Sequence, residues 1–123
     1  MGPLGSFIQK AGAKKYVAKS LRLKAEALAK MNNVEGAVQL MEDALKIAQK
    51  VGNPPILWQT NYSIGLLLEE QGNQQKANEH HAEAIALIEA TASKLNDPSL
   101  KDSLLTSAQT KAIRDAYART KSA

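Results

Sequence analysis

The chain contains no cysteine among its 123 residues, and aromatic residues make up only 4% of it. The absence of cysteine excludes a disulfide framework, a thiolate metal site and a cysteine nucleophile. No apolar run approaches the roughly 18 residues that a membrane-spanning helix requires, so we expect no transmembrane segment. Ile, Val, Thr and Tyr are outnumbered by Ala, Leu, Lys, Glu and Gln, and this composition favours helices over strands.

What is present suffices for one folded domain. Hydrophobic residues make up 44% of the chain and charged residues 23%, which is ordinary for a globular protein and argues against disorder. Near the N-terminus, Gly2-Pro3-Leu4-Gly5-Ser6 resembles the scar of a cleaved fusion tag, so we assign residues 1–6 to a tag scar and residues 7–12 to a flexible lead-in. Residues 7–15 lack the apolar core of a signal peptide, and the default expectation is a cytoplasmic location.

An internal repeat organises the middle of the chain. At an offset of 40 residues, small residues align with small residues in three pairs: Ala25 with Gly65, Ala37 with Ala77 and Ala44 with Ala84. Small side chains let helix backbones approach closely at a crossing, while Leu and Met fill the remaining grooves. Each repeat unit therefore consists of two apolar-periodic arms joined by a short polar turn.

The periodicity within each arm is helical. Val17, Leu21, Ala25 and Leu28 follow the spacing of one helix face, and the other arms repeat this pattern. Gly52-Asn53-Pro54-Pro55 and Asn96-Asp97-Pro98 mark helix ends, because glycine accepts a left-handed cap and proline cannot continue a helix. The sequence predicts an all-α fold with two helical hairpins, over residues 13–51 and 56–95.

This arrangement of small and large positions resembles the tetratricopeptide repeat (TPR), and its long period is similar to the subgroup with elongated helices. The positions at which the family pattern has a large aromatic residue are not matched. Leu28 or Leu68 stands where Tyr is expected, and Met41 or His81 stands where Phe is expected. The resemblance implies a short right-handed solenoid. Residues 99–121 resemble the C-terminal capping helices of such arrays, which cover the apolar face of the last repeat.

Few residues suggest catalysis or metal binding. His80 and His81 are adjacent, so they point about 100° apart on a helix and cannot share one metal ion. We expect His81 to point inward and pack, and we expect the carboxylates of Glu69 and Glu70 to lie on a solvated face. The sequence contains no supported catalytic triad and no Gly-rich phosphate loop. It therefore predicts no enzymatic activity, no cofactor and no metal site.

Trp58 and Tyr62 lie one turn apart on the expected third helix. Packing against the preceding hairpin is the leading interpretation for this pair. The alternative is that Tyr62 faces the concave side of the solenoid and contacts a bound peptide.

Charge is distributed unevenly along the chain, although its net value is only +4. Residues 10–31 hold seven basic residues and one acidic residue, residues 32–97 four and nine, and residues 98–123 five and two. The basic first helix is most simply a solvated face. An acidic segment of a partner, the acidic middle of a second copy and phosphates are the alternatives. Tyr16 is the single aromatic residue among these lysines and no recognised motif accompanies them, so we expect no nucleic-acid binding.

The family resemblance also implies a function. In TPR arrays the first helix of each hairpin lines a concave groove, and the matching positions here are Lys19, Arg22, Leu23, Glu26, Gln59, Tyr62, Ser63 and Leu66. Lys19 and Arg22 with Gln59 could hold a carboxylate through charge-assisted hydrogen bonds. The expected function is a non-catalytic scaffold that binds a peptide or helix of a partner protein, with an acidic segment as one candidate. The alternative is a homodimer or an intramolecular coupling domain, because two hairpins are fewer than the three repeats that a stable stack usually needs.

Overall fold

The computed structural model describes the backbone of residues 14–121 and the side chains of residues 20–121. Every regular element in this part of the chain is a helix, which confirms the all-α prediction. The expected tag scar, the lead-in, and residue 13 of the first hairpin lie outside the described residues. The helices are α2 (Lys14–Lys30), α3 (Val34–Val51), α4 (Pro54–Glu70), α5 (Gln74–Ser93), α6 (Pro98–Leu105) and α7 (Ala108–Lys121).

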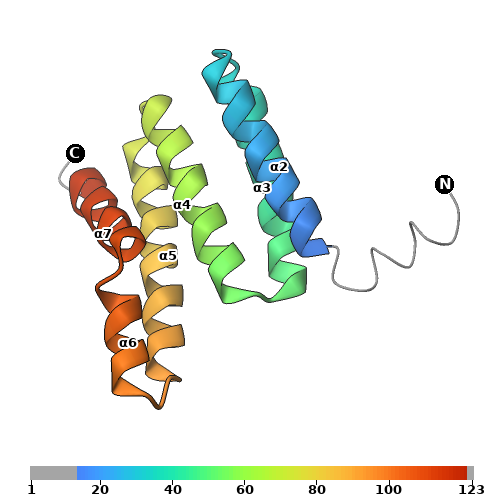
Figure 1. The fold of residues 1–123 in the computed structure, drawn as a ribbon. Coiled ribbons are helices and arrows are strands. Elements are labelled where there is room, and N and C mark those ends of the chain that lie inside the picture. Colours follow the sequence, from blue (N-terminus) through green and yellow to red (C-terminus); the bar gives the residue numbers. More distant parts are fainter. Residues whose placement is uncertain (1–13, 122–123) are drawn as a thin grey trace, which may run out of the picture.

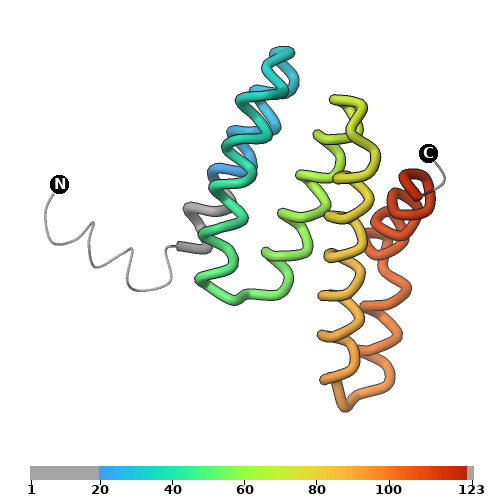
Figure 2. Tube along the Cα trace, turned by 180° about the vertical axis from the view of Figure 1, so that it is seen from behind, coloured from blue at the N-terminus to red at the C-terminus, as the bar shows by residue number. Residues whose placement is uncertain are grey.

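The helices stack as hairpins in chain order. Helices α2 and α3 form the first hairpin, α4 and α5 form the second, and α3 packs against α4 to join them (Figure 1). Helices α6 and α7 pack against α5. The view from behind shows α4 on one side of α5 and the two capping helices on the other (Figure 2). The result is a TPR-like solenoid whose C-terminal end is covered by α6 and α7. No helix in the described part of the chain is long and apolar enough to cross a membrane.

Polar side chains fix where the helices begin. The side-chain oxygens of Asn33, Asn53 and Asn73 each accept a hydrogen bond from a backbone N–H in the first turn of the following helix, at 3.1, 3.1 and 3.3 Å. Asp97 caps α6 in the same way, at 2.8 Å from the N–H of Ser99. The second hairpin begins at Pro54 rather than at residue 56, because proline is tolerated in the first turn of a helix.

The turns that follow α2, α3 and α4 each contain a residue in a left-handed backbone conformation. Gly52 has a φ of 71°, and its N–H donates to the carbonyl of Ala48, so the predicted left-handed cap is confirmed. Asn32 and Gly72, which are equivalent at the 40-residue offset, also have positive φ values of 64° and 80°. The two hairpins therefore turn with the same backbone geometry.

The core confirms the packing role of the small residues. All six small residues of the repeat pattern are buried: Ala25, Ala37, Ala44, Gly65, Ala77 and Ala84. One apolar cluster joins the first hairpin to α4 through buried residues that include Met41, Ile64 and Leu68. A second cluster, formed by Trp58, Ala84, Ile88 and Ile113, joins α4 and α5 to α7.

Trp58 shows where the sequence interpretation was wrong. Its ring belongs to the second cluster, and its indole Nε1–H donates to Oε1 of Gln109 on α7 at 3.0 Å. Trp58 therefore packs against the capping helix and not against the preceding hairpin. The reason is the placement of α7, which covers a face of α4 that the spacing of Trp58 and Tyr62 alone does not identify.

Candidate functional site

A hollow of about 290 Å³ opens between the first helices of the two hairpins, α2 and α4. Its floor is mostly apolar, and charged side chains stand among the residues around it. The residues that line it are Glu26, Ala29, Lys30, Met41, Ser63, Leu66, Leu67 and Glu70. With the exception of Met41 from α3, all of these residues belong to α2 or α4.

Three of the residues expected to face a groove line this hollow. Glu26 and Ser63 are half-buried, and Leu66 keeps 36% of its surface exposed. They meet because residues three or four positions apart lie on the same helix face and the repeat register turns that face of α2 toward the same face of α4. The hollow is therefore open to solvent at Leu66.

The remaining candidates lie elsewhere. Arg22 and Gln59 are half-buried and Leu23 is 52% exposed, and none of the three lines the hollow. Tyr62 is also half-buried, and its ring packs against that of His81 with a centroid separation of 5.6 Å. Lys19 falls within α2, but its side chain lies outside the described residues. Binding of a ligand carboxylate by Lys19, Arg22 and Gln59 thus stays a prediction.

Sequence reasoning missed much of the hollow, including Lys30, Met41, Leu67 and Glu70. Two of these residues carried a usable signal. Lys30 follows Glu26, and Glu70 follows Leu66, at the i, i+4 spacing that keeps residues on one helix face. Extending the predicted face by one turn toward the helix ends would have identified both.

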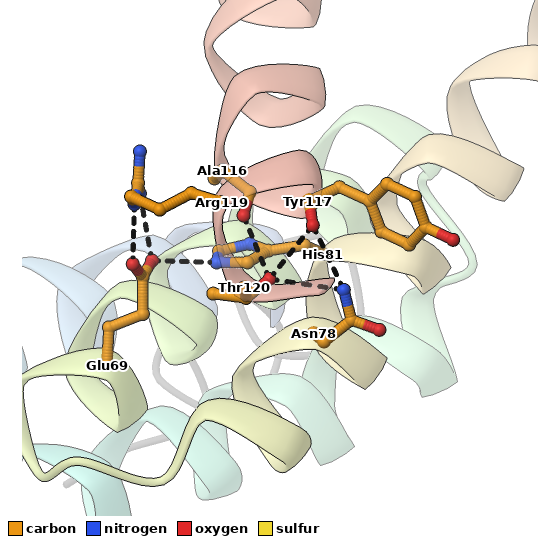
Figure 3. Close-up of polar contacts among 7 residues, drawn as sticks. All are labelled: Glu69, Asn78, His81, Ala116, Tyr117, Arg119 and Thr120. Carbon is orange, nitrogen blue, oxygen red and sulfur yellow. Dashed lines mark hydrogen bonds and ion pairs between the residues drawn. The ribbon is translucent and has the colours of Figure 1, made fainter. Parts of the chain in front are cut away.

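A polar cluster next to Tyr62 joins α4, α5 and α7 (Figure 3). The buried His81 donates from Nε2–H to Oε2 of Glu69 at 3.0 Å. Arg119 of α7 reaches the same carboxylate with its Nε and Nη2 atoms, at 2.7 and 3.0 Å. The prediction that His81 packs inward is confirmed. The prediction that Glu69 lies on a solvated face is wrong, because α7 covers this carboxylate and leaves only 14% of its side chain exposed; its neighbour Glu70 is exposed as expected.

The environment shifts the protonation of this cluster. The hydrogen bond from Arg119 is the largest cause that lowers the pKa of Glu69, so the carboxylate is charged at neutral pH. Burial lowers the pKa of His81 although the hydrogen bond that it donates to Glu69 acts in the opposite direction, so the ring is neutral at pH 7. With Nε2 carrying the proton, Nδ1 of His81 is a buried acceptor with no hydrogen-bond partner among the described residues.

A second polar contact holds the end of α7. Asn78 of α5 donates from Nδ2 to the carbonyl of Tyr117 at 3.1 Å and to Oγ1 of Thr120 at 3.2 Å (Figure 3). Thr120 is buried, and its hydroxyl donates to the carbonyl of Ala116 at 2.8 Å. The cluster of His81, Glu69 and Arg119 and this Asn78 contact together attach α7 to both helices of the second hairpin. They are structural contacts and leave the hollow on the other side of α4 free.

The histidine pair offers no metal site. Nδ1 of His80 lies 2.9 Å from Oδ1 of Asn61, while His81 points into the core. Burial is the largest cause that lowers the pKa of His80. Among the residues whose side chains the structure describes, no group of three or more His, Cys, Asp or Glu could hold a metal ion.

Stacked helical hairpins with a hollow between their first helices define a helical-repeat protein. The sequence model of the family described as tetratricopeptide repeat matches residues 16–90, which is more than half of the chain. The chain therefore belongs to the tetratricopeptide repeat family, and the family suggests a protein-interaction module. Neither the comparison with curated proteins nor that with solved structures gave a match.

Proposed function

We propose that this chain is a non-catalytic interaction module that binds a peptide or helix of a partner protein in the groove between α2 and α4. The observation that carries the proposal is the hollow in this groove, which Glu26, Ser63 and Leu66 line together. A site with an apolar floor and a few polar groups is typical of a surface that anchors a side chain of a ligand. The charged side chains at its edge are accessible and could orient that ligand.

The structure of the rest of the domain supports a rigid binding surface. Helix α4 carries one wall of the groove and is itself held by apolar clusters on both sides. A surface built on helices that are fixed by packing changes little on binding, so a ligand loses less free energy to ordering the protein. The groove-facing side chains can thus act as preformed anchors.

The test is a selection of random displayed peptides on the immobilised protein, followed by binding measurements on the selected peptides by fluorescence anisotropy. We expect Leu66→Asn to weaken their binding at least about fivefold, as loss of a central apolar contact does. Leu100→Asn on α6 is the matched control, because Leu100 is 57% exposed and lies outside the groove. Peptides whose affinity responds equally to both substitutions, or no selected peptide at all, would overturn the proposal.

Self-assembly is tested on the same preparation by sedimentation equilibrium over a concentration series at low and high salt. A constant monomer mass of 13.3 kDa leaves the groove available for a partner and supports the proposal. A mass that rises with concentration and falls with salt would instead favour homo-oligomerisation through the oppositely charged blocks of the sequence.

A further inference from the structure

The chemistry of the hollow between α2 and α4 indicates which side chain it accepts, and this inference rests on the proposed function. Ala29 and Leu66 provide the accessible apolar surface within it, and the buried side chains of Met41 and Leu67 lie beneath. Glu26 and Glu70 contribute carboxylates from the two opposing helices, α2 and α4. A side chain that fills this space must therefore be apolar along its length and tolerate negative charge beside it.

Among the described residues, no basic side chain forms an ion pair with either of these two carboxylates. Neither Glu26 nor Glu70 makes an ion pair or a side-chain hydrogen bond within the described part of the chain. The adjacent residue Glu69 shows the contrast, because Arg119 and His81 both bind its carboxylate. Glu26 is also half-buried beside apolar surface, where a charge gains more from a partner than it does in open solvent.

The described residues that line the hollow carry a net negative charge. Lys30 is the one basic residue among those that line it, against two carboxylates, and its side chain is exposed to solvent. A neighbouring shallow hollow shares Glu70 and adds Glu35 as its other charged residue. Negative charge therefore continues from the hollow toward the turn between α2 and α3.

We propose that this hollow binds an arginine side chain of the partner peptide. The three methylene groups of arginine pack on Leu66 and Ala29, and the guanidinium group lies between the carboxylates of Glu26 and Glu70. Arginine suits this site better than lysine does, because its planar guanidinium group can pair with two carboxylates and is more weakly hydrated. The acidic peptide expected from the basic first helix would place like charges together at this point of the groove.

The experiment uses the peptides selected on the unmodified protein. We expect them to share an arginine flanked by apolar residues, and we expect its replacement by citrulline, an uncharged isostere, to weaken binding about fivefold or more. The double variant Glu26→Gln/Glu70→Gln should weaken the arginine peptide to a similar extent and should no longer distinguish it from the citrulline peptide. Glu83→Gln/Glu89→Gln, at two exposed positions on α5, is the matched control and should leave both affinities unchanged.

The outcomes separate this inference from the proposed function. Selected peptides that lack basic residues but lose affinity on Leu66→Asn would overturn the arginine inference and leave the peptide-binding groove intact. The arginine inference is equally overturned if citrulline weakens binding to the double variant as much as it does to the unmodified protein. Peptides insensitive to Leu66→Asn would overturn both. A preference that reverses to a glutamate peptide in Glu26→Lys/Glu70→Lys would support the arginine inference independently.

Discussion

Gly65 and His81 occupy the positions in the second hairpin that Ala25 and Met41 occupy in the first, at the 40-residue offset. The imidazole ring of His81 lies so close to the backbone of Gly65 that a Cβ atom there would sit 2.3 Å from Cε1 of the ring. At equivalent positions, the first hairpin therefore combines Ala25 with Met41, and the second combines Gly65 with His81. The flexible Met side chain coexists with alanine, whereas the rigid imidazole requires glycine.

The first prediction concerns this pair. Gly65→Ala should lower the free energy of unfolding by about 1–3 kcal/mol, because the added methyl group overlaps a buried ring that Glu69 holds in place. Denaturant unfolding followed by circular dichroism measures this change. The loss should exceed the small gain that alanine gives over glycine in a helix interior.

The control is the double variant Gly65→Ala/His81→Met, which reproduces the Ala25 and Met41 pair of the first hairpin. We expect it to be more stable than the sum of the two single substitutions implies, since the clash disappears with the imidazole ring. Strictly additive effects would show that the ring is not what restricts residue 65.

The second prediction is a loss of stability in mild acid. Burial lowers the pKa values of His80 and His81 below the unfolded value of 6.5, so the unfolded chain binds protons before the folded one does. This part of the stability is fully present above pH 6.5 and is lost as the pH falls below it. The slope cannot exceed about 1.4 kcal/mol per pH unit for each histidine. Glu69, whose pKa is lowered from 4.5, adds a further loss only below that pH.

Unfolding measured between about pH 7 and pH 5 tests this prediction. His81→Gln should reduce the slope, because glutamine can still donate to Glu69 but does not titrate. His80→Gln should remove the other contribution. An unchanged slope in His81→Gln would mean that the imidazole ring protonates without cost in the folded protein.

At the scale of the elements, helix α7 depends on side chains from both helices of the second hairpin. Glu69 of α4 binds Arg119, Asn78 of α5 binds the last turn of α7, and Ile113 fills the apolar contact between them. The family resemblance led us to expect capping helices over residues 99–121, and the structure has α6 and α7 there, with Ile113 and Ala116 buried. The sequence did not predict the polar contacts, since Glu69 and Arg119 are 50 positions apart and have no equivalent pair in the repeat pattern.

The third prediction compares the stability that is lost when either residue of the Arg119–Glu69 ion pair is replaced by alanine. Arg119→Ala should cost about 1 kcal/mol or less, because 53% of the Arg119 side chain is exposed and solvent screens its charge. Glu69→Ala should cost more, about 1–3 kcal/mol, because it also leaves the buried Nε2–H of His81 without an acceptor. Thermal or denaturant unfolding of both variants measures the order. Equal costs would show that the His81 hydrogen bond contributes nothing to stability.

At the scale of the whole molecule, the repeat register is the sequence feature that predicted most of the buried residues. It placed Ala25, Ala37 and their equivalents in the core, because the offset fixes which helix face each residue occupies. The expectation that Glu26, Ser63 and Leu66 face a groove came from the family resemblance, and these three residues line the hollow. The register could not place Trp58, because the surface that covers it comes from α7, which lies outside the repeat. Contacts within and between repeats follow from periodicity, whereas contacts with a non-repeating cap depend on how that cap docks.

The division into two apolar clusters makes the stability of the chain uneven from end to end. In a stack of repeats each unit contacts only its neighbours, so weakening one interface need not unfold the far end at once. The cluster around Met41 joins the first hairpin to α4, and the cluster around Ile113 joins α4 and α5 to α7. Trp58 is the single tryptophan of the chain and lies in the second cluster, so its fluorescence reports the docking of α7.

The fourth prediction follows from this position of Trp58. Ile113→Ala removes a fully buried side chain and should cost about 2–5 kcal/mol. In this variant, the red shift of Trp58 emission should come at lower denaturant than the loss of helical circular dichroism, because α7 leaves before the hairpins unfold. Met41→Ala is the matched control, because it removes an equally buried side chain from the first hairpin. In this variant the loss of helical circular dichroism should begin at lower denaturant than the red shift of Trp58 emission. If both variants instead show one coincident transition, the chain unfolds as a single cooperative unit, and the docking of the cap contributes to the stability of the groove-forming helices α2 and α4 through the second hairpin.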